Sequence, residues 1–141
     1  MKINVGSLPR DASESRGVTI VIDVFRAFTT AAIAFSRGAS KITLVAEAED
    51  ALSLYESGYA NLLMGEVGGA KPTGFDLGNS PHEASVYNFQ DKHIVQSTRN
   101  GTVGANAASQ TASDIFLGSF IVAKATVNQI LKMNPEEVSI I

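Results

Sequence analysis

The sequence contains no cysteine, and only 18% of its 141 residues are charged. The absence of cysteine excludes disulfides, zinc–thiolate sites and thiol nucleophiles, and it fits a reducing cytoplasm. No apolar run approaches the roughly 20 residues that span a bilayer, and the N-terminus has no long apolar segment of the signal-peptide type. A cytoplasmic protein with no membrane partner is therefore expected.

Basic residues are also few and are not clustered. The chain has 11 Lys and Arg residues against 14 Asp and Glu residues, for a net charge of −3. This balance argues against nucleic acid as a partner. The 45% content of hydrophobic residues and the length suit one domain with a hydrophobic core, so residues 1–141 are expected to form a single α/β domain.

The order of apolar segments predicts alternating strands and helices. Strands are expected at 2–5, 17–23, 41–46, 61–65, 92–98, 114–119 and 136–141, and helices at 26–38, 49–58, 80–87, 101–110 and 120–133. This alternation is typical of an α/β fold with a mostly parallel sheet and helices on both faces. The apolar ending "VSII" suggests that the chain is the N-terminal part of a longer protein; an exposed last strand would also allow pairing in a homodimer.

Ligands of parallel sheets bind beyond the carboxyl ends of the strands, so the residues that follow the strands are the first candidates for a site. Those residues are Asp23 and Arg26, Gly65 and Glu66, Thr98 and Asn100, and Gly118 and Ser119. Several of these residues also have a simpler structural interpretation. Asp23 would cap the next helix or pair with Arg26, Glu66 would be a solvated loop acid, and Asn100 would form a turn with Gly101.

The stretch "GFDLGNSPHEA" at residues 74–84 joins a glycine-rich loop to a helix. Ser80, Pro81 and Glu83 have the spacing of an N-cap, a first helical residue and the acid of a capping box. The free N–H groups and the positive dipole end of such a helix favour an anion. This stretch is therefore predicted to combine an acid, Asp76, with an anion-binding helix start.

Several chemistries lack their motifs. "GEVGGAKP" differs from a phosphate-binding loop at Ala70 and Pro72, no G-x-G-x-x-G follows a strand, and no G-x-S-x-G is present. His82 and His93 lack metal-ligand spacing. The carboxylates that the sequence does contain suit a metal bound through oxygen atoms. Asp23, Glu66 and Asp76 are hard ligands of the kind that Mg²⁺ takes. Arg26 would bind phosphate.

These motifs, in this order, resemble a known family. "VIDVFRAFTTA", "GEVGG", "GFDLGNSP" and "STRNGT" followed by "LGSF" are similar to the 2-phosphosulfolactate phosphatases of coenzyme M biosynthesis, over residues from about 18 to the end. The resemblance implies a Mg²⁺-dependent phosphatase that hydrolyses 2-phospho-3-sulfolactate, or a similar small phosphorylated acid, to sulfolactate and phosphate. It also implies an α/β fold particular to the family.

The matched motifs carry over the residues of the expected site, which are Asp23, Arg26, Glu66, Asp76, Asn79, Ser80, Thr98 and Asn100. Chemistry assigns Asp23, Glu66 and Asp76 to the metal. Either Asp23 or Asp76 would orient or deprotonate the attacking water, and the other residues would bind substrate.

Two positions depart from the family pattern. Val67 stands where the pattern usually has arginine, and Arg99 stands within a motif that is otherwise rich in threonine, where it would restore part of the positive charge. Family members also continue past this end with a further acidic motif. The alternative function is therefore a non-catalytic or truncated anion-binding domain of the same family.

Overall fold

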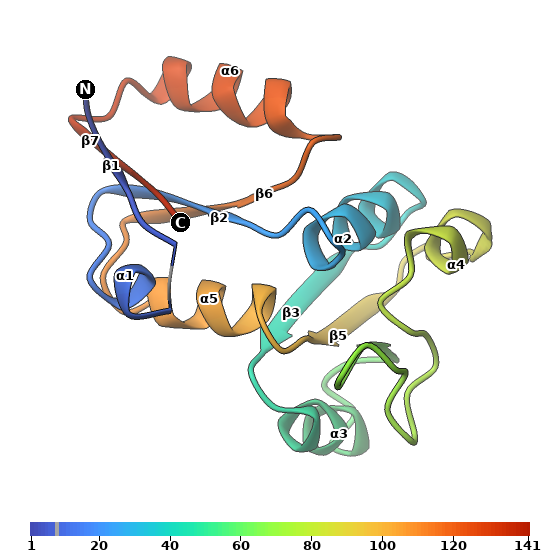
Figure 1. Cartoon of the computed structure of the whole chain (residues 1–141). Coiled ribbons are helices and arrows are strands. Elements are labelled where there is room, and N and C mark those ends of the chain that lie inside the picture. Colours follow the sequence, from blue (N-terminus) through green and yellow to red (C-terminus); the bar gives the residue numbers. More distant parts are fainter. Residues whose placement is uncertain (8) are drawn as a thin grey trace.

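A computed structural model describes residues 1–7 and 9–141, and within them the chain alternates between strands and helices (Figure 1). The strands are β1 (Lys2–Val5), β2 (Val18–Ile22), β3 (Lys41–Val45), β4 (Leu62–Gly65), β5 (His93–Ser97), β6 (Asp114–Gly118) and β7 (Glu137–Ile140). The helices are α1 (Pro9–Ser13), α2 (Ala27–Ser36), α3 (Ala48–Glu56), α4 (Pro81–Val86), α5 (Gly101–Ala108) and α6 (Ala123–Met133). No helix in the described ranges is both long and apolar enough to cross a membrane.

The strands form two sheets, and every pairing within them is parallel. Sheet A has the order β1-β7-β2-β6, and sheet B has the order β3-β5-β4. The predicted α/β class with parallel pairing is thereby confirmed. The division into two sheets could not be read from the sequence, because buried apolar strands such as β4 and β5 do not show which neighbour they pair with.

Helices cover both faces of both sheets. On sheet A, α6 lies over one face, while α1 and α5 lie over the opposite face (Figure 1). On sheet B, α2 and α4 pack against one face around Met64 and Phe89, and α3 packs against the other around Leu63 and Val95. These small apolar cores fix where each strand ends, and thereby which loops meet at the carboxyl edges.

The predicted elements recur with small shifts at their ends. The largest shift is in the last helix, which begins at Ala123 and not at Phe120, because residues 119–122 form a turn. The short helix α1 was not predicted, since five residues are too few to show a helical period. It closes one end of the core through Ala12, which is fully buried.

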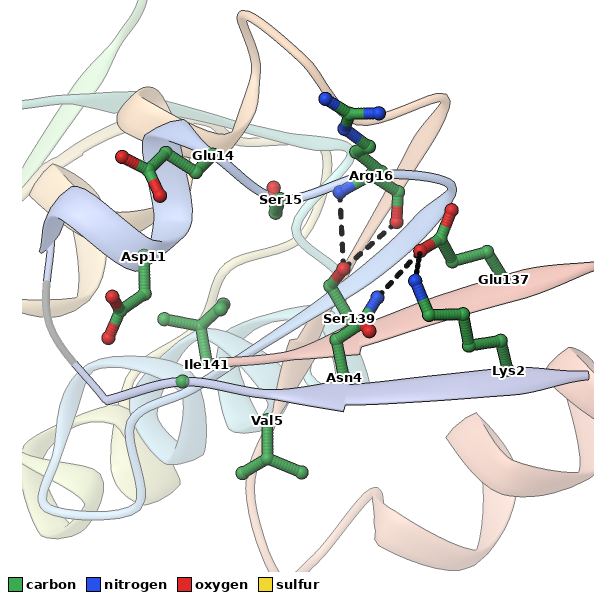
Figure 2. Close-up of a pocket in the computed structure, with 11 residues that line it drawn as sticks. Lys2, Asn4, Val5, Asp11, Glu14, Ser15, Arg16, Glu137, Ser139 and Ile141 are labelled. Atoms are coloured by element: carbon green, nitrogen blue, oxygen red, sulfur yellow. Dashed lines mark hydrogen bonds and ion pairs between the residues drawn. The ribbon is translucent and has the colours of Figure 1, made fainter.

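Strands β1 and β7 present a polar surface on the face that Figure 2 shows. Lys2 Nζ donates to Glu137 Oε1 at 3.0 Å, and Asn4 Nδ2 donates to the same oxygen at 2.8 Å. Ser139 Oγ accepts from Arg16 N and donates to Arg16 O, which holds the start of β2 beside β7. These residues line an open cavity of about 410 Å³, in which Lys2 and Glu137 form an ion pair.

The Asn4 amide and the Lys2 ammonium lower the pKa of Glu137 below its ordinary value. A carboxyl group whose pKa is lowered in the folded state stabilises that state above its unfolded pKa, and the contribution is lost as pH falls through the lowered value. We expect the free energy of unfolding to decrease over this acidic range. We also expect Asn4→Ala to raise the pKa of Glu137 in an NMR titration; an unchanged pKa would contradict the assigned cause.

Candidate active site

Asp23 lies between the N-terminal ends of two helices. It follows β2 directly, and its Oδ1 accepts a hydrogen bond from Ala27 N, in the first turn of α2, at 3.2 Å. Its Oδ2 lies against the first residue of α5, since a Cβ atom placed on Gly101 would be 2.8 Å from that oxygen. Two helix N-termini favour a negative charge here. The helix-capping interpretation of Asp23 therefore holds, and it leaves Oδ2 directed toward α5.

A cavity of about 530 Å³ opens beside this carboxylate at the carboxyl edge of sheet A. Asn100, the residue before α5, lines the cavity together with Asp23 and Gly101. The Asp23 carboxylate and the Asn100 carboxamide thus lie at one opening. This agrees with the expectation that residues following β2 and β5 meet beyond the carboxyl ends of the strands.

Arg26 connects the two sheets. Its Nη2 donates to the carbonyl of Gly69 at 3.3 Å, in the loop after β4. Within the described ranges the guanidinium makes no ion pair with Asp23, so the predicted pairing of these two residues is not realised. A guanidinium carries five N–H donors, so this single contact leaves others for an anion.

Glu66 is buried, which excludes the interpretation as a solvated loop acid. Its Oε2 accepts from Gly69 N at 2.6 Å and its Oε1 accepts from Arg99 N at 2.9 Å. One carboxylate thus joins the loop after β4 to the loop after β5. Asn100, which lines the Asp23 cavity, follows Arg99, so Glu66 helps to position the loop that carries Asn100.

Replacement of this carboxylate by an amide should destabilise the fold. In Glu66→Gln one of the two acceptor oxygens becomes an NH₂ group that faces a backbone N–H, and a buried donor is left unpaired. We expect a loss of about 1–3 kcal/mol in the free energy of unfolding, measured by urea denaturation. Glu49→Gln, at an exposed position on α3, is the matched control; equal stability of the two variants would show that Glu66 does not hold the loops.

The side chain and backbone of Thr98 are engaged in hydrogen bonds with Thr102. Its Oγ1 accepts from Thr102 N at 3.2 Å, and Thr102 Oγ1 accepts from Thr98 N at 2.9 Å while donating to Thr98 O. Both side chains are buried. This reciprocal arrangement fixes the start of α5, so Thr98 shapes the site through that helix end.

A second, smaller cavity of about 150 Å³ lies at the carboxyl edge of sheet B. Glu66 and Thr98 line it, and so do the two positions that depart from the family pattern, Val67 and Arg99. The two substitutions therefore meet at one place, as expected if Arg99 compensates for an arginine lost at Val67.

Asp76 occupies the outer edge of sheet B. Its Oδ2 accepts from Leu63 N at 2.8 Å and its own N–H donates to Leu63 O at 3.1 Å, so it satisfies the free edge of β4. It lines neither of the two cavities at the carboxyl edges. Its contacts are those of a residue that closes a strand edge, and its assignment to metal or water stays a prediction.

Hydrogen bonds within residues 78–83 hold the start of helix α4. Ser80 Oγ accepts from Glu83 N at 3.3 Å, as the capping box predicts, but the Glu83 carboxylate accepts from Gly78 N rather than from Ser80. Asn79 is buried, and its Oδ1 has no hydrogen-bond partner among the described residues. Neither Asn79 nor Ser80 lines the two cavities, so their role in substrate binding also stays a prediction.

The three carboxylates do not form one ligand cluster. Across residues 1–7 and 9–141, no three His, Asp or Glu side chains come close enough together to hold a metal ion. Mg²⁺, however, is usually held by one or two carboxylates, with waters and substrate phosphate oxygens completing its octahedron. The Asp23 carboxylate and the Asn100 carboxamide, which line one cavity, fit a site of that kind.

The main contributors that sequence reasoning missed are glycines. Gly101 contacts Asp23, and Gly69 is held by both Arg26 and Glu66. Gly101 was interpreted only as the partner of Asn100 in a turn. The pattern "NGT" carries no signal that its glycine packs against an acid 78 positions earlier in the chain.

Comparison with known proteins gives a consistent match. Residues 5–141 match the family described as 2-phosphosulpholactate phosphatase. The chain is 39% identical over all 141 residues to a probable 2-phosphosulfolactate phosphatase of Deinococcus radiodurans, and 38% identical over the same length to one of Thermus thermophilus. It is 40% identical over 116 residues, 82% of its length, to one of Bacillus subtilis.

The relatives are longer than this chain. The matched region makes up 58% of the Deinococcus protein, 59% of the Thermus protein and 50% of the Bacillus protein. About two fifths of each of the first two relatives therefore lies outside the match.

Proposed function

Since the chain belongs to the 2-phosphosulfolactate phosphatase family, we propose that it carries a phosphatase site centred on Asp23. The reaction is the hydrolysis of 2-phospho-3-sulfolactate, or of a similar small phosphorylated hydroxy acid, to the free hydroxy acid and phosphate. The names of the relatives support this substrate class.

The observation that carries the proposal is the position of Asp23. Its carboxylate lies between two helix N-termini and faces a cavity of about 530 Å³ whose opening it shares with Asn100. The positive ends of helices α2 and α5 lie beside this carboxylate and need no rearrangement when charge develops on a phosphoryl group. Arg26 follows Asp23 by three residues, although it does not line this cavity, and it is the cation that the proposal assigns to the phosphate oxygens.

Hydrolysis forms one bond to phosphorus and breaks another. The oxygen of a water attacks phosphorus, the bond from phosphorus to the C2 oxygen of the acid breaks, and that oxygen takes up a proton from solvent. In this proposal Asp23 orients this water and accepts its proton, a role that the sequence leaves open between Asp23 and Asp76. Asn100 would orient the phosphate, and Arg26 would neutralise its charge.

Mg²⁺ is the proposed cofactor. Asp23 and Asn100 would hold it, and when bound it would neutralise phosphate oxygens as a Lewis acid. Glu66 supports this site indirectly, because both of its oxygens accept backbone N–H groups. The chain's own contribution is to fix the loops that carry Asn100 and Gly69.

The test is phosphate release from 2-phosphosulfolactate, with 2-phospholactate as the analogue that lacks the sulfonate. It should be run on this chain and on the full-length Deinococcus relative. We expect release that depends on Mg²⁺ and stops with EDTA. Release that is unchanged by EDTA would argue against a metal, and release by the relative but not by this chain would favour the non-catalytic, anion-binding alternative.

A further inference from the structure

A cluster of polar and charged side chains lies at the amino-terminal edge of sheet B, the edge opposite to that of the candidate active site. Lys41 and Thr43 stand at alternate positions of β3 and therefore share one face of the sheet. Lys41 pairs with His93 and Thr43 pairs with Val95, so His93 lies on the same face. That face is the one covered by α3, because Val95 packs in its core cluster.

The turn after α3 brings Tyr59 to this cluster. Two hydrogen bonds attach the turn to β5, since Asn61 N donates to His93 O at 3.0 Å and His93 N donates to Asn61 Oδ1 at 3.0 Å. Tyr59, two residues before Asn61, packs edge-on against the imidazole of His93, with 4.8 Å between the ring centroids. The phenol is thereby held against the sheet, and with 46% of the residue exposed it stays open to reagents in solution.

The phenol oxygen of Tyr59 accepts a hydrogen bond from the ammonium group of Lys41. Lys41 Nζ donates to Tyr59 Oη at 3.0 Å. The same nitrogen lies 4.9 Å from the centroid of the phenol ring, a distance at which a cation is attracted to the ring. Within the described residues Lys41 forms no ion pair with a carboxylate, so its charge is directed to this phenol.

Thr43 supplies a second donor to the same oxygen. Its hydroxyl forms a hydrogen bond with the Tyr59 phenol, and its Oγ1 also lies 2.8 Å from His93 Nε2. A hydroxyl carries a single proton. Because that proton is donated to Tyr59, His93 Nε2 carries the hydrogen of the second bond and donates it to Thr43 Oγ1. The phenol oxygen thus faces an ammonium and a hydroxyl, with an imidazole N–H behind the hydroxyl.

Two donors aimed at one phenol oxygen favour its deprotonated form. The hydrogen bonds from Lys41 and Thr43, followed by the charge of Lys41, lower the pKa of Tyr59 below its ordinary value. Tyr55, in the last turn of α3, is an internal comparison. It is exposed to a similar degree, at 39%, and its phenol oxygen makes no hydrogen bond within the described residues. The two phenols therefore differ in their hydrogen bonds and not in their access to solvent.

We propose that Tyr59 is a nucleophilic tyrosine, the site at which this protein accepts an acyl group from an activated acyl donor. The phenolate oxygen is the nucleophile, and Lys41 and Thr43 are positioning residues that stabilise its charge. The oxygen forms a bond to the acyl carbon, the bond from that carbon to the leaving group breaks, and the phenol proton passes to solvent. The cluster lies at the opposite edge from Asp23, so the inference does not depend on the proposed activity.

The test is acetylation of the 141-residue chain by N-acetylimidazole, an acyl donor whose leaving group is imidazole. The chain has no cysteine to compete for the reagent, and it has only three tyrosines. Peptide mass spectrometry measures the rate of acetylation at each of them. Hydroxylamine removes acetyl groups from phenols and not from lysine amines, so it identifies the phenol ester. We expect Tyr59 to react at least about threefold faster than Tyr55.

Four variants test the cause of this difference. Lys41→Met removes the charge and the donor, and the rate at Tyr59 should fall to that at Tyr55. Lys41→Arg keeps a charged donor and should retain the faster rate. Thr43→Val removes the second donor and should lower the rate by a smaller factor than Lys41→Met. Lys132→Met, at an exposed position on α6, is the matched control and should leave the ratio of the two rates unchanged.

Two results would overturn the proposal. Equal rates at Tyr59 and Tyr55 in the unmodified protein would show that the donors do not activate the phenol. A faster rate at Tyr59 that persists in both Lys41→Met and Thr43→Val would assign it to exposure alone. Circular dichroism and thermal unfolding of each variant establish that it is folded, which is expected because Lys41 is exposed and valine has nearly the shape of threonine.

Discussion

Asp23→Asn should lower kcat/KM for phosphate release by about two to four orders of magnitude, the usual contribution of a general acid–base residue. Asparagine is nearly isosteric and keeps an oxygen that can accept from Ala27 N, so the start of α2 should persist. What it lacks is the negative charge and the ability to accept a proton from water. The measurement is steady-state release of phosphate from 2-phosphosulfolactate at saturating Mg²⁺.

The matched control is Asp114→Asn. Asp114 is an exposed aspartate at the first position of β6, at the opposite end of the strand from the candidate site. We expect its activity to equal that of the unmodified protein. Retention of full activity in Asp23→Asn, with activity lost in Asp76→Asn, would move the catalytic role to the loop at the edge of β4.

Gly101→Ala should destabilise the protein although alanine favours helices. At an ordinary helix position the change from glycine to alanine gains ~1 kcal/mol. Here the new Cβ would lie 2.8 Å from both Asp23 Oδ2 and Ala27 Cβ, and both neighbours are held by α2. We expect a net loss of about 1–3 kcal/mol in the free energy of unfolding, as for other overpacked sites.

Gly104→Ala gives the internal comparison for that measurement. It lies one turn later in α5, where the nearest atom to a new Cβ is Val21 Cγ1 at 3.2 Å, a side-chain methyl that can shift. We expect this variant to be close to neutral or more stable by up to ~1 kcal/mol in urea denaturation. If both variants gained stability equally, Asp23 would not be in contact with α5 as described.

Most of the fold was predictable because its signals are local. Buried strands such as 18–22 and 93–97 are continuous β-branched or apolar runs, and the helix start at Ser80 is fixed by residues within one turn. The division into two sheets is a matter of pairing between distant segments. Pairing partners leave no mark on strands that are buried on both faces.

The candidate site was predictable only in outline. Strand ends identified Asp23, Glu66 and Asn100 correctly as residues of the carboxyl edges. The sequence does not show what each acid binds. Glu66 binds two backbone N–H groups and Asp76 binds the N–H of Leu63, and these contacts depend on how loops fold back on strands.

The most direct test of the account is to locate the anion site on the 141-residue chain itself. An NMR titration of the ¹⁵N-labelled protein with inorganic phosphate, in the presence of Mg²⁺, reports which amides respond. A site centred on Asp23 predicts the largest shifts at Val24, Ala27, Asn100 and Gly101. Shifts confined to residues 76–83, or no shift at saturating phosphate, would contradict it.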